Sequence, residues 1–317
     1  MSSIFTVSIF QSALELGCIY ALVALALFIS FTILNIADLT TDGCFTLGCA
    51  VGAMVTLAGH PFLALFAALI SGAMAGFVTA FLQTKLGVES ILAGIIVNTG
   101  LYTVNIAVMG FSSLTNLFGC DTIFSLGKDG FACTIFGDWF KVVIVAVLVM
   151  GIALLLWWFL GTTLGMSIRA TGDNAEMVKS SSINPTFTIT VGLCLANSLT
   201  GLSGALIAQY QKSADINIGT GMVTISLASL IIGQSLIGNK GSTLRRIIGT
   251  ILGSVLYRFI VAIALRLSVP AEALKLVSAL IVAVAIAAPY VRRKTALKKR
   301  EFENYRGNHG REVKENA

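Results

Sequence analysis

Charge is what this sequence has least of. Only 11% of its 317 residues are Asp, Glu, Lys or Arg, whereas soluble domains carry about 25%. Four prolines leave little room for a soluble linker. Hydrophobic residues make up 56% of the chain, and helix-length apolar runs recur as far as residue 290. One crossing of the bilayer core takes about 20 apolar residues, so we predict an all-α integral membrane protein with many crossings.

Enzyme signatures are also missing. His60 and His309 are the only histidines, and no HExxH motif or clustered His/Cys set occurs, which argues against a metal hydrolase. The stretch GQSLIGNKGS, residues 233–242, resembles a phosphate-binding loop, but Asn239 separates its second glycine from the lysine. A P-loop needs that lysine directly after the glycine. We therefore predict a chain that is not an enzyme and holds no nucleotide, metal or other cofactor.

The six cysteines form no CxxC pair. Cys120 and Cys133 share one polar loop and could form a disulfide if that loop faces outward. A reducing setting would leave both thiols free, so the two alternatives stay open.

Nine apolar segments stand out, which predicts a bundle of about eight to ten membrane segments. They run approximately over residues 10–34, 45–58, 62–83, 91–111, 139–160, 187–209, 222–237, 247–267 and 274–290. The second and seventh are short and rich in Gly, Ser and Thr, and each follows a long run and a polar loop. The two units, 31–58 and 207–237, begin five segments apart and so have opposite orientations. This pattern predicts an inverted repeat with discontinuous helices, which is typical of a substrate path.

Basic residues set the orientation. Residues 291–317 hold nine basic and four acidic residues, which predicts a cytoplasmic tail that contacts anionic lipid headgroups. The transmembrane domain would then span residues 1–290. Counting back along the chain places the loop 161–186 in the cytoplasm and the loop 112–138 outside, and nine crossings leave the N-terminus outside.

Glycine pairs with GxxxG spacing let helix backbones approach closely. They occur at Gly48–Gly52, Gly72–Gly76 and Gly249–Gly253. Packing inside one bundle explains them better than dimerisation does.

The cytoplasmic loop holds an unusual polar stretch, LGMSIRATGDNAEMVKSSSINP, at residues 164–185. Asp173 and Asn174 are good N-caps, and about two turns of helix follow, with Met177 and Val178 on a small apolar face. A capped helix between two membrane segments suits contact with a soluble partner. The alternative is a solvated connector.

The order of residues in this stretch is specific. G-x-x-x-R-A-x-G-D-N-A followed by S-I-N-P resembles the cytoplasmic coupling loop of ABC importer permeases of the branched-chain amino acid, ribose and nucleoside type. GCIYALVALALFISFTILNIADLTTDG, residues 17–43, resembles the first membrane segment of that family, and TGLSGALIAQY, residues 200–210, resembles the segment after the coupling loop. The I-L-N-I-A-D-L-T-T-D-G form looks closest to a branch linked to aromatic amino acid uptake. One departure is Ser182, where many relatives carry Gly.

The resemblance implies a bacterial inner-membrane importer. Two copies of this chain, or one with a paralogous permease, would sit on two ATPase subunits that bind ATP and Mg²⁺. An extracellular or periplasmic solute-binding protein would deliver a small polar solute, first of all an aromatic amino acid, with a sugar or nucleoside as the alternative. The residues that would contact the ATPase, with Met177 and Val178 filling a cleft on it, are Arg169, Asp173, Asn174, Glu176, Met177, Val178 and Lys179.

Polar residues at membrane depth predict the substrate path, because carboxylates and irregular backbone are tolerated there only where they line protein or a wet cavity. The predicted path residues are Asn35, Asp38, Thr40, Thr41, Asp42, Asn217 and Thr220. Alternatively, Asp38 and Asp42 cap the short helix that follows them, and both roles could hold.

Other polar residues in the apolar runs have a structural interpretation. Asn98, Asn105 and Asn197 are expected to make hydrogen bonds between helices, and Arg258 is expected to pair with a carboxylate such as Glu15.

A second class of function fits the composition equally well. An ion-gradient-driven transporter or channel would use Asp38, Asp42 or Glu15 as a titrating group. The coupling-loop motif favours the importer, because a self-sufficient carrier needs no capped helix for a partner. Nothing beyond the charged tail suggests nucleic acid binding.

Overall fold

The computed structural model describes residues 7–129, 137–237 and 242–266, together with five single residues nearer the C-terminus. Cys133, most of the predicted ninth segment (274–290) and the tail (291–317) lie outside the described residues. The predicted pairing of Cys120 with Cys133 therefore stays a prediction, as does the cytoplasmic tail.

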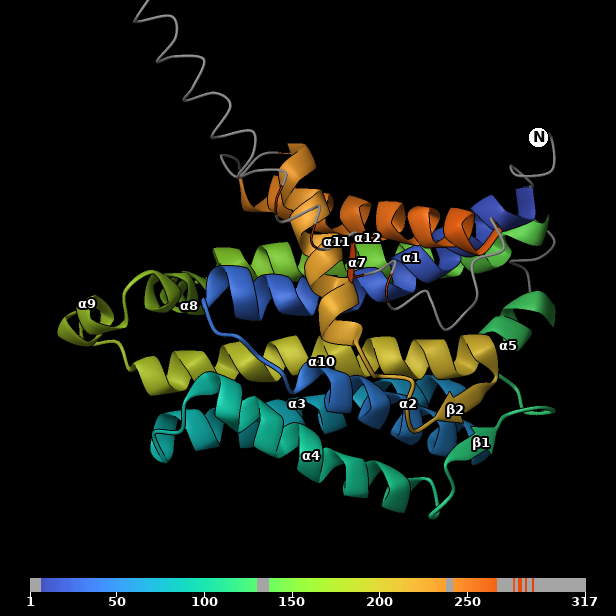
Figure 1. Cartoon of the computed structure of the whole chain (residues 1–317), viewed down its shortest axis with the longest axis horizontal. Coiled ribbons are helices and arrows are strands. Elements are labelled where there is room, and N and C mark those ends of the chain that lie inside the picture. The colour runs from blue at the N-terminus through green and yellow to red at the C-terminus, as the bar shows by residue number, and fades with distance from the viewer. Residues whose placement is uncertain are drawn as a thin grey trace, which may run out of the picture.

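Helices account for nearly all of the described chain (Figure 1). Their bounds are α1 Val7–Leu27, π-helix η1 Phe28–Ile33, α2 Thr41–Leu57, α3 Pro61–Lys85, α4 Ser90–Val108, α5 Ile123–Asp129, 3-10 helix η2 Gly137–Trp139, α7 Phe140–Gly161, α8 Thr163–Asp173, α9 Ala175–Ser180, α10 Pro185–Gln211, α11 Met222–Ile237 and α12 Thr243–Arg266. Two short strands, β1 Leu114–Asn116 and β2 Ser213–Asp215, complete the described elements.

Among the described residues, six helical segments are long and apolar enough to cross a membrane. They are α1 continued by η1, α3, α4, α7, α10 and α12, while α2 and α11 are apolar but shorter. The chain is therefore a helical, multi-pass membrane protein, and eight of the nine predicted segments coincide with these helices.

Burial separates central from peripheral helices. The most apolar windows of α1 and α10 are each 83% buried inside the chain, whereas those of α4 and α7 are 28% and 22% buried. Exposed faces of the outer helices carry large apolar side chains such as Phe66 on α3 and Leu155 on α7. Since apolar side chains are stable facing lipid, the buried pair forms the centre and the other helices surround it.

The glycine pairs pack inside the bundle, as predicted. A Cβ atom at Gly48 of α2 would collide with the backbone of Gly201 on α10, and one at Gly253 of α12 would collide with the backbone at Gly233 on α11. Only glycine permits these contacts, because any side chain would force the helix axes apart.

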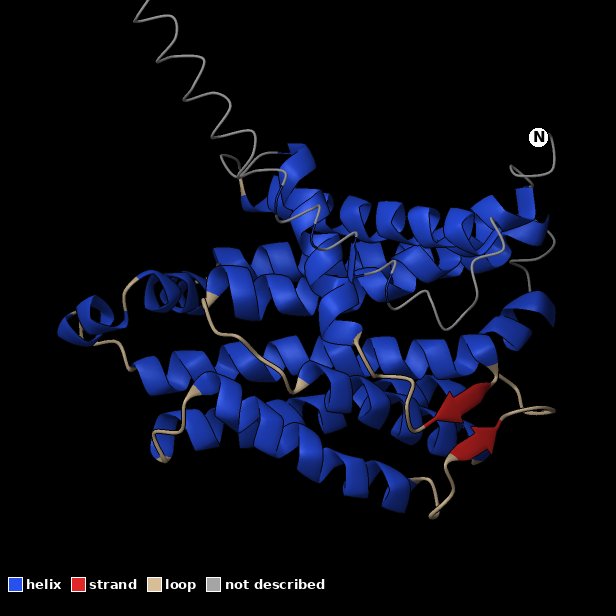
Figure 2. Ribbon diagram, viewed as in Figure 1, coloured by secondary structure: helices blue, strands red, loops and turns tan. Residues whose placement is uncertain are grey.

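Within the part of the chain that the structure describes, one pair of strands interrupts the helical architecture (Figure 2). β1 and β2 pair antiparallel with Leu114 opposite Asp215, which joins the loop after α4 to the loop after α10. Figure 1 shows α8 and α9 at the opposite end of the molecule. The loop that holds β1 and the loop 161–186 therefore lie at opposite ends of the molecule, and the side of the membrane on which each lies stays a prediction.

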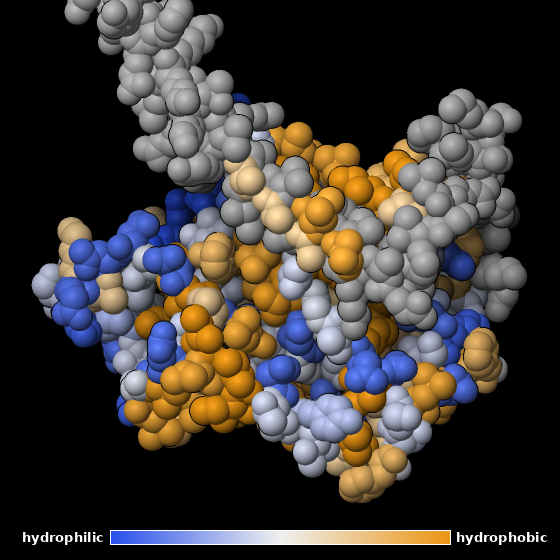
Figure 3. Space-filling model, in the orientation of Figure 1, coloured by the Kyte–Doolittle hydropathy of each residue, from blue (hydrophilic) through white to orange (hydrophobic). Residues whose placement is uncertain are grey.

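Surface polarity follows the same axis. Figure 3 shows hydrophilic residues gathered at the end that holds α8 and α9, and orange apolar patches on the side of the bundle. The polar end is therefore suited to water and the sides to lipid.

Candidate functional site

The first half of the chain is interrupted by an irregular stretch at residues 34–40. Asn35 ends the π-helix in a left-handed conformation with φ of 56°, which asparagine tolerates better than most residues. The chain then runs back from the α8 end towards the middle of the molecule, where α2 begins at Thr41 (Figure 1). Asn35 is exposed and acts as a turn residue.

Asp38 fixes the start of α2 to the central helix α10. Its Oδ1 accepts a hydrogen bond from the Thr40 backbone N–H at 2.9 Å, and its Oδ2 accepts one from Asn197 Nδ2 at 2.7 Å. The Thr41 hydroxyl donates to the Asp38 carbonyl at 3.3 Å. Thr40 Oγ1 lies 2.8 Å from Thr79 Oγ1 of α3. These buried groups hydrogen-bond one another and so hold the start of α2 against α3 and α10.

Asp42 caps the other short helix. Its Oδ2 accepts a hydrogen bond from Gly221 N at 3.0 Å, and its Oδ1 accepts one from Val223 N at 2.9 Å. Both donors lie at the N-terminus of α11, where backbone N–H groups lack partners and the helix dipole favours negative charge. The expectation that Asp42 caps its own helix, α2, is therefore wrong. Its carboxylate joins the two predicted repeat units instead.

A polar pocket of about 210 Å³ opens beside this contact. We call it the α2–α4 pocket. The residues that line it are Asp42, Gly43 and Thr46 of α2, Asn98, Thr99, Tyr102 and Asn105 of α4, and Ile216, Asn217, Gly219 and Thr220 of the stretch before α11. A polar pocket in so apolar a bundle is the arrangement expected of a solute path.

The pocket divides the predicted path residues into two groups. Asp42, Asn217 and Thr220 line it. The other four, Asn35, Asp38, Thr40 and Thr41, do not line it and serve the turn and the start of α2 described above. Sequence periodicity cannot separate the two groups of residues, because the direction of each side chain depends on contacts with α3 and α10.

The structural interpretation of the asparagines is confirmed in part. Asn105 Nδ2 donates to the Gly43 carbonyl at 3.1 Å and so joins α4 to α2, whereas Asn197 of α10 donates to Asp38 in the irregular stretch before α2. Asn98 and Asn105 also line the pocket, as do Thr46, Thr99 and Tyr102, which sequence reasoning missed. A signal was present, because positions 98, 102 and 105 fall on one face of an otherwise apolar helix.

The polar stretch at residues 164–185 forms two short helices, α8 and α9, at the hydrophilic end of the molecule (Figure 3). Asn174 is the N-cap of α9, and its Oδ1 accepts from Glu176 N at 3.1 Å and Met177 N at 3.0 Å. Lys179 Nζ pairs with Glu176 Oε1 at 2.8 Å. Asp173 is the last residue of α8, so its predicted role as an N-cap is wrong.

The apolar face of α9 is divided. Met177 is 68% exposed, whereas Val178 is only 4% exposed and packs into its own chain. Val178 is therefore not available to fill a cleft on a partner, which corrects the sequence-based expectation. The remaining predicted contact residues, Arg169, Asp173, Asn174, Glu176 and Lys179, are exposed.

Ser182 follows α9 in a left-handed conformation with φ of 60°. Glycine adopts this conformation without steric cost, whereas a residue with a side chain does not. Asn184 then caps α10, accepting from Thr186 N at 3.0 Å, with Pro185 as the first helical residue.

The predicted Glu15–Arg258 pair does not form. Glu15 accepts hydrogen bonds from Tyr210 Oη at 2.7 Å and from Gln11 Nε2 at 3.1 Å. The Arg258 guanidinium carbon lies 3.6 Å from the centroid of the Tyr20 ring. Within the described parts of the chain, the single ion pair is Lys179–Glu176. Each charged group thus finds an aromatic neighbour instead of the other charge.

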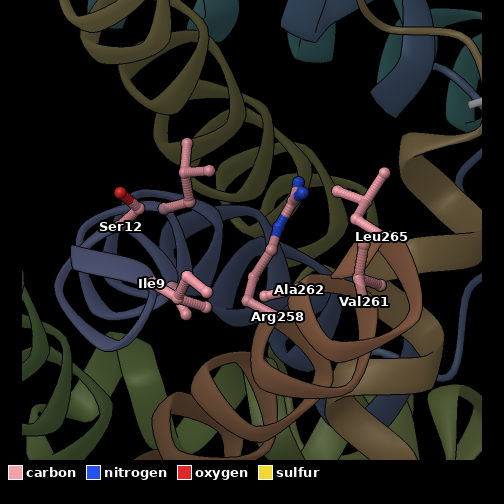
Figure 4. A pocket seen from close by; sticks show the side chains of 8 residues that line it. Ile9, Ser12, Arg258, Val261, Ala262 and Leu265 are labelled. Atoms are coloured by element: carbon pink, nitrogen blue, oxygen red, sulfur yellow. The ribbon is translucent and has the colours of Figure 1, made fainter. Parts of the chain in front are cut away.

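Arg258 also borders a larger pocket of about 420 Å³ between α1 and α12. Figure 4 shows its side chain extending between Ser12 of α1 and Leu265 of α12. The lining residues given for this pocket include no carboxylate, and most are aliphatic. Its electrostatic character is therefore opposite to that of the α2–α4 pocket.

Residues 9–288 match the family model described as branched-chain amino acid transport system / permease component. The chain belongs to this family. The recognised coupling-loop and first-segment motifs lie inside the matched range, and the resemblance inferred from them is confirmed.

Individual relatives span most of this permease. It is 32% identical over 272 residues to a tyrosine transport system permease protein of Clostridioides difficile (strain R20291), covering 86% of this chain and 88% of the relative. It is 30% identical over 234 residues to the ribose import permease protein RbsC of Escherichia coli (strain K12), covering 70% and 67%. A solved structure, PsaBC from Streptococcus pneumoniae in complex with Fab, aligns with a TM-score of 0.48 and 14% identity over 87% of this chain and 89% of that chain.

Family membership decides the broad class. The chain is a multi-pass permease component of an ABC importer and not an enzyme, as the sequence predicted, and the component itself calls for no cofactor. An importer of this kind works with ATPase subunits and a solute-binding protein.

Proposed function

We propose that this permease carries a small polar solute through the α2–α4 pocket, and that the first solute to test is an aromatic amino acid. The observation that carries the proposal is the position of the pocket at the point where the starts of α2 and α11 meet. Discontinuous helices of this kind surround substrate sites in many transporters.

The amino acid assignment draws on two further observations. The I-L-N-I-A-D-L-T-T-D-G motif lies next to the pocket, and a relative at 32% identity is a tyrosine transport permease. Relatives that are ribose and galactofuranose permeases supply the alternative, a sugar.

The exposed residues of α8 and α9 would transmit the ATPase motion. Met177 is the apolar residue presented to the partner, and Arg169, Asp173, Asn174, Glu176 and Lys179 surround it as polar contacts. In this scheme residues 1–290 form the permease domain, 161–186 its cytoplasmic coupling loop, 112–138 the extracellular loop that meets the binding protein, and 291–317 the basic cytoplasmic tail. Two copies of the chain pair in the working complex.

Co-purification tests the coupling surface. The intact permease, expressed with a candidate ABC ATPase subunit, should bring that ATPase down, and Met177→Ser should weaken the association. Lys85→Ala is the matched control, because Lys85 is an exposed cation at the end of α3 and outside the coupling loop.

Uptake into proteoliposomes that hold the whole importer tests the transport function. ATP supplied on the side of the membrane that holds the ATPase subunits should drive uptake of L-tyrosine. An ion gradient alone should not. Uptake on a sodium or proton gradient without any associated ATPase would replace the importer with the secondary transporter.

A further inference from the structure

We infer that the α2–α4 pocket binds the ammonium group of the transported solute. This rests on the proposed function, because it treats the pocket as part of the solute path. It adds which chemical group the pocket recognises and which residues recognise it.

Hydroxyl groups in the pocket present oxygen lone pairs. Thr46 Oγ1 donates its proton to the Asp42 carbonyl at 3.1 Å, and Thr99 Oγ1 donates its proton to the Ile95 carbonyl at 2.8 Å. Since a hydroxyl has one proton and two lone pairs, both groups are left as acceptors. A ligand that meets them must therefore supply N–H or O–H donors.

The charge of the pocket lining further limits the chemical class of ligand that fits. Asp42 brings a carboxylate, and the residues given as lining the pocket include no Lys, Arg or His. The two N–H groups at the start of α11 offset the negative charge only in part, since a helix N-terminus is equivalent to about half a positive charge. A carboxylate in an apolar bundle favours a nearby cation. An ammonium group therefore fits better than the uncharged hydroxyls of a sugar.

Asn105 adds a buried acceptor without a partner. Its side chain is 1% exposed, its Nδ2 is engaged by the Gly43 carbonyl, and its Oδ1 has no hydrogen-bond partner. A buried amide oxygen without a donor is costly, and Asn105 lines the pocket. A solute with several N–H donors would supply what this wall lacks.

The pocket between α1 and α12 has a lining of the opposite charge. Its charged lining residue is Arg258, and most of its other walls are aliphatic. That pocket suits an anion or an apolar group, so the two pockets are not interchangeable sites for one ligand.

Direct binding measurements distinguish which group of the solute the pocket recognises. The permease–ATPase complex in nanodiscs, without the binding protein, is titrated with L-tyrosine, with tyramine, which keeps the amine, and with 3-(4-hydroxyphenyl)propionate, which keeps the carboxylate. We expect L-tyrosine and tyramine to compete with each other and the propionate to compete with neither.

Two variants in the chain make a matched pair. Thr46→Val and Thr56→Val both alter buried threonines of α2 whose hydroxyls donate to the carbonyl four residues earlier, and only Thr46 lines the pocket. Thr46→Val should weaken L-tyrosine and tyramine binding about tenfold, the size expected for one hydrogen bond to a charged group. Thr56→Val should leave binding unchanged. Asn105→Leu is the second test of the same wall and should act in the same direction.

Three results would overturn the inference. They are propionate binding as tight as tyramine binding, equal effects of Thr46→Val and Thr56→Val, and displacement of tyrosine from the complex by sodium ions or ribose. Each can occur while ATP-driven uptake by the whole importer persists, in which case the proposed function stands. Absence of ATP-driven uptake together with loss of ATPase association would instead refute the proposed function.

Discussion

The end formed by α8 and α9, which we propose as the coupling end, and the centre of this permease are built mainly from different kinds of contact. At α8 and α9 most hydrogen bonds join residues two to four positions apart, such as Asn174 with Glu176 and Met177. One longer-range bond, between the Thr171 and Thr188 hydroxyls, ties α8 to α10. At the centre, Asp38 reaches Asn197 and Asp42 reaches Gly221 and Val223, over 159 to 181 positions. The coupling end is thus a mainly local structure, whereas the centre exists only once both halves of the chain have packed.

This difference predicts which substitutions lower the stability of the whole molecule. Loss of a long-range contact at the centre should loosen two helices at once. Loss of a local contact at the coupling end should affect one short helix and its partner.

The largest effect is expected for Asp42→Ala. The substitution removes the acceptor for two backbone N–H groups at the start of α11, so the permease should lose about 3 kcal/mol of stability. Thermal unfolding in detergent, monitored by the monodisperse fraction, measures the loss. Asp215→Ala is the control, because the exposed Asp215 carboxylate accepts the local N–H of Asn217, two residues on. Equal losses in both variants would contradict a special role for the centre.

Gly48→Ala should follow, with a loss of about 2 kcal/mol. A Cβ atom at this position would meet the backbone of Gly201, and overpacking of a tight helix contact costs about 1–3 kcal/mol. Gly151→Ala in α7 is the matched control, since no heavy atom lies within 4 Å of a Cβ atom there. That control should be neutral or slightly stabilising, because alanine favours the helix. A destabilised Gly151→Ala protein would show that the control site is packed after all.

Asn174→Ala should have a smaller effect, confined to the coupling end. Loss of the N-cap of α9 costs about 1 kcal/mol of helix stability. Global unfolding should change little, while solute-stimulated ATP hydrolysis by the reconstituted importer should fall. Hydrogen exchange at residues 175–180 measures the local effect. Faster exchange throughout α10 would show that the coupling end is not local.

The smallest effect is expected for Ser182→Gly, and it is favourable. Serine holds a left-handed conformation after α9, and relief of that conformation by glycine should contribute about 0.5 kcal/mol. The same hydrogen-exchange measurement should show slower exchange in α9. Ser181→Gly is the control, since Ser181 has a φ of −90° and should gain nothing.

The features that could be predicted from the sequence alone are again the local ones. Segment positions could be predicted because each crossing helix needs a run of apolar residues, and eight runs match helices within a few residues. The Asn174 cap and the Glu176–Lys179 pair could be predicted because both depend on spacing along one helix. The direction of Val178 could not, because its burial depends on packing against the rest of the chain.

The central site shows where prediction from sequence stops. Asp42, Asn217 and Thr220 were recognised as polar groups at membrane depth, and they line the pocket. Thr46, Thr99 and Tyr102 were missed, because threonine and tyrosine in an apolar run are unremarkable until a second helix faces them. The Glu15–Arg258 pair failed for a related reason, since Tyr210 and Tyr20 offered each charge a closer neighbour.

The sequence by itself determined that this chain is a helical membrane protein with a capped polar loop, because hydropathy and capping are properties of neighbouring residues. Its motifs, rather than its hydropathy, identified the permease family. The tertiary structure decided that Asp42 caps α11 and that α2 and α4 enclose an acceptor-lined pocket. Those facts depend on which helices meet, and helix pairing is set by glycine contacts and buried hydrogen bonds between residues far apart in the chain.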